Sequence, residues 1–145
     1  MRIMAVDYGE VRTGIAVSDE SSVILSDAWV LHEKSQDTVA KIIATEAQTR
    51  NVGKIIIGYP KNLKGQAGIA AKKSEELAKK VRKESPIEVE LYDERLTTVE
   101  ANRILIDNNK RGKQKKNTVD AVAASLILDS YLTKIKNEQA KEKHR

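Results

Sequence analysis

Residues 3–18 read IMAVDYGEVRTGIAVS, and this stretch decides the fold. It opens with a short, uninterrupted apolar run at residues 3–6, which is typical of a β-strand covered on both faces. Residues 13–18 have the composition of a second strand, and the Gly9–Arg12 connection is short enough for a hairpin. We therefore expect two antiparallel strands, with Asp7 at the end of the first.

The rest of the chain predicts an α/β fold: a five-stranded mixed sheet with helices on both faces. A third antiparallel strand is expected within residues 23–31, and strands at residues 55–58 and 87–91 should join in parallel through right-handed crossovers. Helices are expected from an N-cap at Asp37, in a lysine-rich segment that ends before Ser85-Pro86, from Thr97 to about Ile106, and from about Thr118 to Lys134. Residues 108–116 should form a basic loop.

The composition excludes several classes of protein. A chain of 145 residues suits one domain, and the absence of cysteine excludes disulfide scaffolds, thiolate zinc sites and a thiol nucleophile. The chain has no apolar run near the ~18 residues that a membrane span needs. Its first apolar run is shorter than the ~7–15 residues of a signal-peptide core. We therefore expect a soluble, cytoplasmic protein.

The basic charge is concentrated in patches although the formal net charge is only +5. Residues 61–83 carry eight Lys and Arg against two Glu, and residues 110–116 carry five basic residues and no acid. This layout is expected of a polyanion binder, although a solvated lysine-rich surface explains it equally well. With one Trp, four Tyr and no Phe, contacts to backbone phosphates are favoured over base stacking.

Three carboxylates have unusual settings for surface acids. Asp7 ends a buried strand, and Glu94 follows a strand at the carboxyl edge of the sheet, where open α/β sheets build sites. Asp120 is the only charge between Thr118 and Leu128, in a helix that is apolar nearly all round. Each carboxylate also has an ordinary structural explanation. Asp7 could bind the amides of the turn that follows it, and Glu94 could form an ion pair with Arg95. Asp120 could be stabilised by the dipole of its own helix.

Brought together, these acids would repel one another unless a cation lay between them. Oxygen-only ligands favour Mg²⁺ or Mn²⁺, as one or two ions, and we expect neither His32 nor His144 to be a ligand. Such a centre beside basic residues could hydrolyse a phosphodiester, because cations offset the charge that develops on the phosphate. The candidate nucleic-acid-binding residues are Arg12, Lys61, Arg95, Lys115 and Lys116.

Four blocks of the sequence, in this order, resemble the motifs of the YqgF-type family, which is described as Holliday-junction-resolvase-like or as pre-16S rRNA nucleases. They are Asp7–Ala16, Gly58–Asn62 with Gly65 and Gly68, Asp93–Thr98, and Val119-Asp120 with Ala123-Ala124, and the resemblance covers about residues 1–133. Two departures are Tyr59, where members usually carry Leu, and Ile69-Ala70-Ala71, which lacks an expected basic residue.

The resemblance implies a ribonuclease H-like nuclease domain at residues 1–134. It implies catalysis and divalent-metal binding by Asp7, Glu94 and Asp120. It further implies a role in maturing the 5′ end of pre-16S rRNA during ribosome biogenesis. From the sequence itself, residues 135–145 are expected to form a basic, disordered tail.

Three alternatives remain open at this point. A resolvase that cuts branched DNA would use the same residues and would need a dimer, so the chain is either a monomer or a homodimer. A non-catalytic RNA-binding assembly factor would bind nucleic acid without cutting it. The spacing of Asp7, Gly9 and Gly14 also resembles the phosphate loop of actin-like ATPases and sugar kinases, but those folds need two such domains.

Overall fold

The computed structural model describes residues 1–60, 68–93 and 112–143, with the side chains of residues 112–120 and 143 left undescribed. Along the chain the elements are β1 (Arg2–Asp7), β2 (Arg12–Ser18), β3 (Leu25–His32), α1 (Gln36–Thr49), β4 (Val52–Tyr59), α2 (Ile69–Glu84), β5 (Glu88–Asp93) and α4 (Gly112–Lys143). In these ranges, none of the helices is both long and apolar enough to pass through a membrane.

The five strands form one mixed sheet in the order β3-β2-β1-β4-β5. Strand β2 pairs antiparallel with both β1 and β3, whereas β4 pairs parallel with both β1 and β5. The predicted sheet of three antiparallel strands followed by two parallel ones is therefore confirmed.

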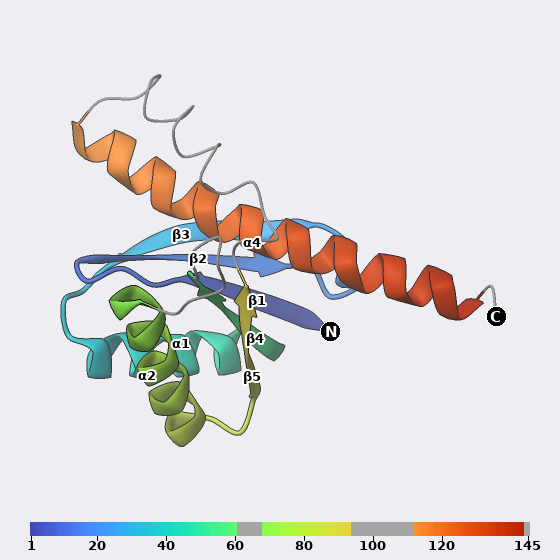
Figure 1. The fold of residues 1–145 in the computed structure, drawn as a ribbon, viewed down its shortest axis with the longest axis horizontal. Coiled ribbons are helices and arrows are strands. Elements are labelled where there is room, and N and C mark those ends of the chain that lie inside the picture. The colour runs from blue at the N-terminus through green and yellow to red at the C-terminus, as the bar shows by residue number, and fades with distance from the viewer. Residues whose placement is uncertain (61–67, 94–111, 144–145) are drawn as a thin grey trace.

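Helices cover both faces of the sheet, with α1 and α2 on one side and α4 on the other (Figure 1). The alternation of side chains along β1 explains the two layers, because successive residues point to opposite faces. Met4 and Val6 pack with α1 and α2, whereas Ile3 and Ala5 pack with α4. Strand β1 is thus buried on both faces, as its apolar run predicts.

Aromatic and small residues fix α4 on the sheet. Ala123 and Ala124 are completely buried, so the helix backbone comes close to the strands. Farther along the helix, the Tyr131 ring meets the Tyr92 ring of β5 edge to face at 5.5 Å, and the Tyr92 hydroxyl lies 2.8 Å from Ser130 Oγ. These contacts fix the position of α4 on the sheet.

Three predicted helix boundaries are wrong. Helix α1 has Ser35 rather than Asp37 as its N-cap, because the Ser35 hydroxyl accepts a hydrogen bond from the Thr38 amide at 3.3 Å. Asp37 lies in the first turn, where its carboxylate pairs with Lys80 Nζ at 2.9 Å. Either residue type can cap a helix, so only the backbone conformation distinguishes them.

The other two errors concern the ends of α4. This helix begins at Gly112, within the predicted basic loop, and it continues to Lys143, although disorder was predicted from residue 135. Lys, Gln and Glu are good helix formers, so these polar ends can be helical without an apolar stripe to reveal them. The helix predicted from Thr97 to Ile106 and most of the loop before Gly68 lie outside the described residues.

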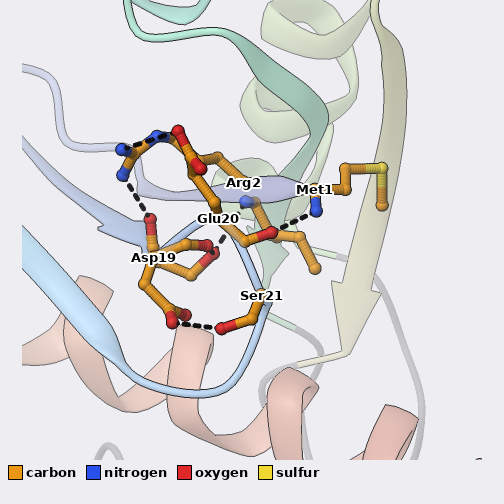
Figure 2. Close-up of polar contacts among 7 residues, drawn as sticks. Met1, Arg2, Asp19, Glu20 and Ser21 are labelled. Atoms are coloured by element: carbon orange, nitrogen blue, oxygen red, sulfur yellow. Dashed lines mark hydrogen bonds and ion pairs between the residues drawn. The ribbon is translucent and has the colours of Figure 1, made fainter.

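The turn between β2 and β3 is organised by Asp19 (Figure 2). Its carboxylate accepts hydrogen bonds from the Ser21 hydroxyl and from the Val23 and Ile24 amides, the latter two at 2.8 and 3.1 Å. The Ser21 hydroxyl and these amides stabilise the charged form, which lowers the pKa of Asp19 from 3.8 to about 2.

This shift predicts a pH-dependent contribution of Asp19 to stability. The folded state holds the Asp19 proton less tightly than the unfolded state, so the contribution is complete above pH 3.8 and is lost as the pH falls to about 2. The stability advantage of the wild type over Asp19→Asn, measured as the urea midpoint, should shrink over this window. An advantage that stays constant from pH 6 to pH 2 would contradict the assignment.

Candidate active site

Asp7 is the last residue of β1 and lies at the carboxyl end of the sheet. It is 9% exposed, which is rare for a carboxylate. The strand alternation places position 7 on the same face as Ile3 and Ala5, the face that α4 covers. Asp7 thus lies at the end of the apolar layer between the sheet and α4, where water screens its charge less than at the surface.

The carboxyl ends of β1, β4 and β5 meet at this edge because the three strands are parallel. Val6 lies opposite Ile57 of β4, and Tyr59 at the end of β4 lies opposite Asp93 at the end of β5. Glu94 is the next residue in the sequence and lies outside the described residues. The sheet therefore brings Asp7 and the residue preceding Glu94 to one edge, with one strand between them.

Helix α4 runs in the direction opposite to β1. Its later residues, including Leu132 and Ile135, line a cavity together with Ser21 and Val23 of the β2–β3 turn. That turn lies beside the amino end of β1, where the Met1 amino group bonds to the Glu20 carbonyl. The earlier turns of α4 accordingly lie toward the carboxyl end of β1, on the side of the β1–β2 connection (Figure 1).

Asp120 belongs to these earlier turns. It precedes the fully buried Ala123 and Ala124 by three and four residues, a spacing that puts residues on one helix face. The Asp120 side chain itself lies outside the described residues.

Of the three predicted catalytic and metal-binding residues, Asp7 alone has a described side chain. Within the described part of the chain, no group of three His, Cys, Asp or Glu side chains is placed to hold a metal ion. A carboxylate-only set of donors fits a hard cation, and Asp7 is a buried carboxylate at the shared edge. The convergence of Asp7, Glu94 and Asp120 remains a prediction.

The connection after Asp7 requires glycine at position 9. A Cβ atom there would lie 2.3 Å from the Arg12 carbonyl oxygen, which is backbone and cannot move aside. The Thr13 hydroxyl, which is fully buried, reaches the Gly9 carbonyl at 3.5 Å. The spacing of Asp7, Gly9 and Thr13 in the sequence therefore reflects a tight turn beside the candidate site.

The structure describes only some of the five basic residues that are predicted to bind nucleic acid. Arg12 is the half-buried first residue of β2, close in sequence to Asp7, and lies opposite His32 of β3. Lys115 and Lys116 belong to α4 rather than to the predicted loop, and their side chains are not described. Lys61 and Arg95 lie outside the described residues. Contact of these five residues with nucleic acid remains a prediction.

One basic residue beside the site was missed by the sequence analysis. Lys73 of α2 forms an ion pair with Glu10 of the β1–β2 connection. Two residues farther along α2, Glu75 accepts a hydrogen bond from the Tyr59 hydroxyl, and this bond raises the pKa of Tyr59. The available signal was Lys72-Lys73, which directly follows the apolar Ile69-Ala70-Ala71.

The fold is that of a ribonuclease H-like protein, the class to which the sheet order and the acid at the end of β1 point. A solved structure described as "T. thermophilus RuvC in complex with Holliday junction substrate" matches with a TM-score of 0.56 at 13% identity, over 90% of this chain and 94% of that one. A second structure, "Thermus thermophilus RuvC structure", matches with a TM-score of 0.51.

The family follows from the sequence. The model of the RuvX family, described as "Holliday junction resolvase", matches residues 1–134, and the chain belongs to this family. A protein of Halothermothrix orenii named "Putative pre-16S rRNA nuclease" is 38% identical over 132 residues, which cover 91% of this chain and 94% of that protein. A protein of Syntrophus aciditrophicus with the same name is 40% identical over 139 residues, covering 96% and 93%. The resemblance seen in the sequence is confirmed.

Proposed function

We propose that this chain is a divalent-metal-dependent nuclease that hydrolyses phosphodiester bonds and processes the 5′ end of pre-16S rRNA in the cytoplasm, as part of ribosome biogenesis. The observation that carries the proposal is the position of Asp7, a buried carboxylate at the carboxyl end of β1, on the face covered by α4. The family match and the names of the relatives support a hydrolase that acts on nucleic acid.

In this proposal Asp7, Glu94 and Asp120 hold Mg²⁺ or Mn²⁺, as one or two ions. The metal supplies an activated water and stabilises the charge that develops on the scissile phosphate. Two placements support the trio. Glu94 is the residue after Asp93, the last residue of β5, and Asp120 has the helical spacing of the buried Ala123 and Ala124.

The chain's own residues would prepare the site in two ways. Asp7 is only 9% exposed, so little water reaches its carboxylate and its charge interacts more strongly with a bound cation. The basic side chains of Arg12, Lys61, Arg95, Lys115 and Lys116 would bind the phosphates of the substrate and offset their charge.

A second candidate substrate is branched DNA, which the description of the RuvX family and the RuvC-like fold favour. RNA leads because relatives that are 38–40% identical over most of the chain are named for pre-16S rRNA. The two substrates differ in what they require of assembly, because symmetric nicking of a four-way junction needs a dimer with a two-fold axis.

The test uses a labelled 16S rRNA precursor and a four-way DNA junction side by side, each with Mg²⁺, with Mn²⁺ and with EDTA, while sedimentation measures the oligomeric state. We expect metal-dependent cleavage of the precursor. Faster cleavage of the junction by a dimer would instead establish the resolvase. Binding of RNA without any cleavage would establish an assembly factor, and cleavage that persists in EDTA would contradict the metal-dependent mechanism.

A further inference from the structure

Two neighbouring cavities flank the β1–β2 connection on the α2 side of the molecule. One, of about 380 Å³, is lined by Tyr8, Gly9 and Glu10 together with the first turns of α2, including Lys73. The other, of about 520 Å³, shares Tyr8, Glu10 and Lys73 and extends toward α1. The Glu10–Lys73 ion pair thus lies between two hollows that are open to solvent.

The ion pair between Glu10 and Lys73 is exposed enough for another anion to replace Glu10. The Lys73 side chain is 36% exposed and the Glu10 side chain is 69% exposed. Ion pairs this exposed contribute only ~0–1 kcal/mol to stability, because water screens the attraction and two long side chains lose freedom. Little stability is lost when this pair breaks, so a phosphate of a nucleic-acid strand, which releases counterions when it meets a cation, can replace the Glu10 carboxylate at Lys73.

The pair is close to the candidate catalytic centre but on the other side of the sheet. Tyr8 directly follows Asp7 and packs with the layer of α1 and α2, whereas the position of Asp7 belongs to the α4 layer. A strand of nucleic acid that crosses the carboxyl edge of the sheet at Asp7 would consequently pass over the Glu10–Lys73 pair. The phosphate at Lys73 would be a flanking one and not the scissile one.

We propose that Lys73 binds a backbone phosphate that flanks the scissile bond, and that Glu10 occupies Lys73 in the free protein and is displaced by that phosphate. The inference rests on the proposed function, since it takes Asp7 as the point where the substrate strand is cut.

The chain offers a matched control on the same helix. Lys80, two turns after Lys73, pairs with Asp37 at 2.9 Å, and the Lys80 side chain is 37% exposed. Lys80→Gln and Asp37→Asn therefore remove the same charges from an equally exposed pair that lines neither cavity. A difference between the two pairs reports on position rather than on net charge.

The experiment measures binding of a fluorescein-labelled single-stranded RNA by anisotropy over a series of salt concentrations, with thermal unfolding as a check on each variant. Lys73→Gln should weaken binding several-fold and reduce the slope of log K against log salt by about 0.7, the value for one phosphate contact on a single strand. Glu10→Gln should tighten binding, and this gain should vanish in the Lys73→Gln background because the two residues are coupled. Lys80→Gln and Asp37→Asn should have smaller effects that simply add.

Equal effects of the two pairs, or a gain from Glu10→Gln that survives in the Lys73→Gln background, would overturn the inference. If the wild type still cleaves its substrate with Mg²⁺ in that case, the proposed function stands and only the role of Lys73 is lost. A wild type that binds neither RNA nor junction DNA would overturn both.

Discussion

Replacing Asp7 with Asn should lower metal-dependent cleavage by more than about 100-fold while the protein stays folded. Loss of a residue that merely orients a metal ligand already costs 10–100-fold, and Asp7 is proposed as a ligand itself. Asn has the same shape but no negative charge, so it fits the same buried position and holds a divalent cation poorly. The measurement is the rate of cleavage at saturating Mg²⁺, with the urea midpoint as the check on folding.

The matched control is Asp129→Asn. Asp129 lies on α4 and lines the cavity beside the β2–β3 turn, at the edge of the sheet opposite Asp7. Asp129 is exposed on the surface of α4, so the substitution removes a carboxylate far from the proposed centre without disturbing the core. Asp129→Asn should keep the wild-type rate, and equal losses of activity in both variants would show that the loss is not specific to the position of Asp7.

The second large effect concerns the packing of α4. Leu128 is completely buried between this helix and the sheet, and Leu128→Ala should lower the free energy of unfolding by about 2–5 kcal/mol through lost apolar contact and a residual cavity. Leu126→Ala makes the same change at a residue of α4 that is only partly buried, so its loss should be clearly smaller. Denaturant unfolding measures both.

This comparison tests whether α4 is fixed on the sheet by the face that includes Ala123 and Ala124. That face extends by helical spacing to Asp120, so the orientation of the proposed metal ligand depends on it. Equal losses for Leu128→Ala and Leu126→Ala would mean that α4 presents a different face to the sheet.

The strands could be predicted because each depends on residues that are close together in the sequence. The apolar run at residues 3–6 and the short connection to residues 13–18 leave few alternatives to a buried strand and a hairpin. The burial of Asp7 follows from the same run, because the carboxylate directly continues a strand covered on both faces. The parallel pairing of β4 and β5 follows from α2, the helix that connects them.

The ends of the helices could not be predicted in the same way. The polar segments at both ends of α4 have helix propensity but no apolar periodicity, so the sequence contains no signal that separates helix from loop there. At α1, Ser35 and Asp37 are both good caps, and the choice depends on a backbone conformation that neither residue dictates.

The pairing of Lys73 with Glu10 was missed for a different reason. The two residues belong to elements that are distant in the sequence and become neighbours only when α2 packs beside the end of β1. Periodicity and spacing are local measures and do not report such contacts. The excess of lysine in this helix predicts a basic surface but not the partner of any one lysine.

The central claim is that Asp7, Glu94 and Asp120 share a divalent ion, and a crystal structure of the protein with Mn²⁺ tests it most directly through the anomalous signal of the metal. The account predicts one or two metal peaks within about 2.6 Å of oxygens from all three carboxylates, the range of oxygen ligands to hard cations. Manganese bound only elsewhere on the protein, with these carboxylates separated and without a shared ion, would contradict it.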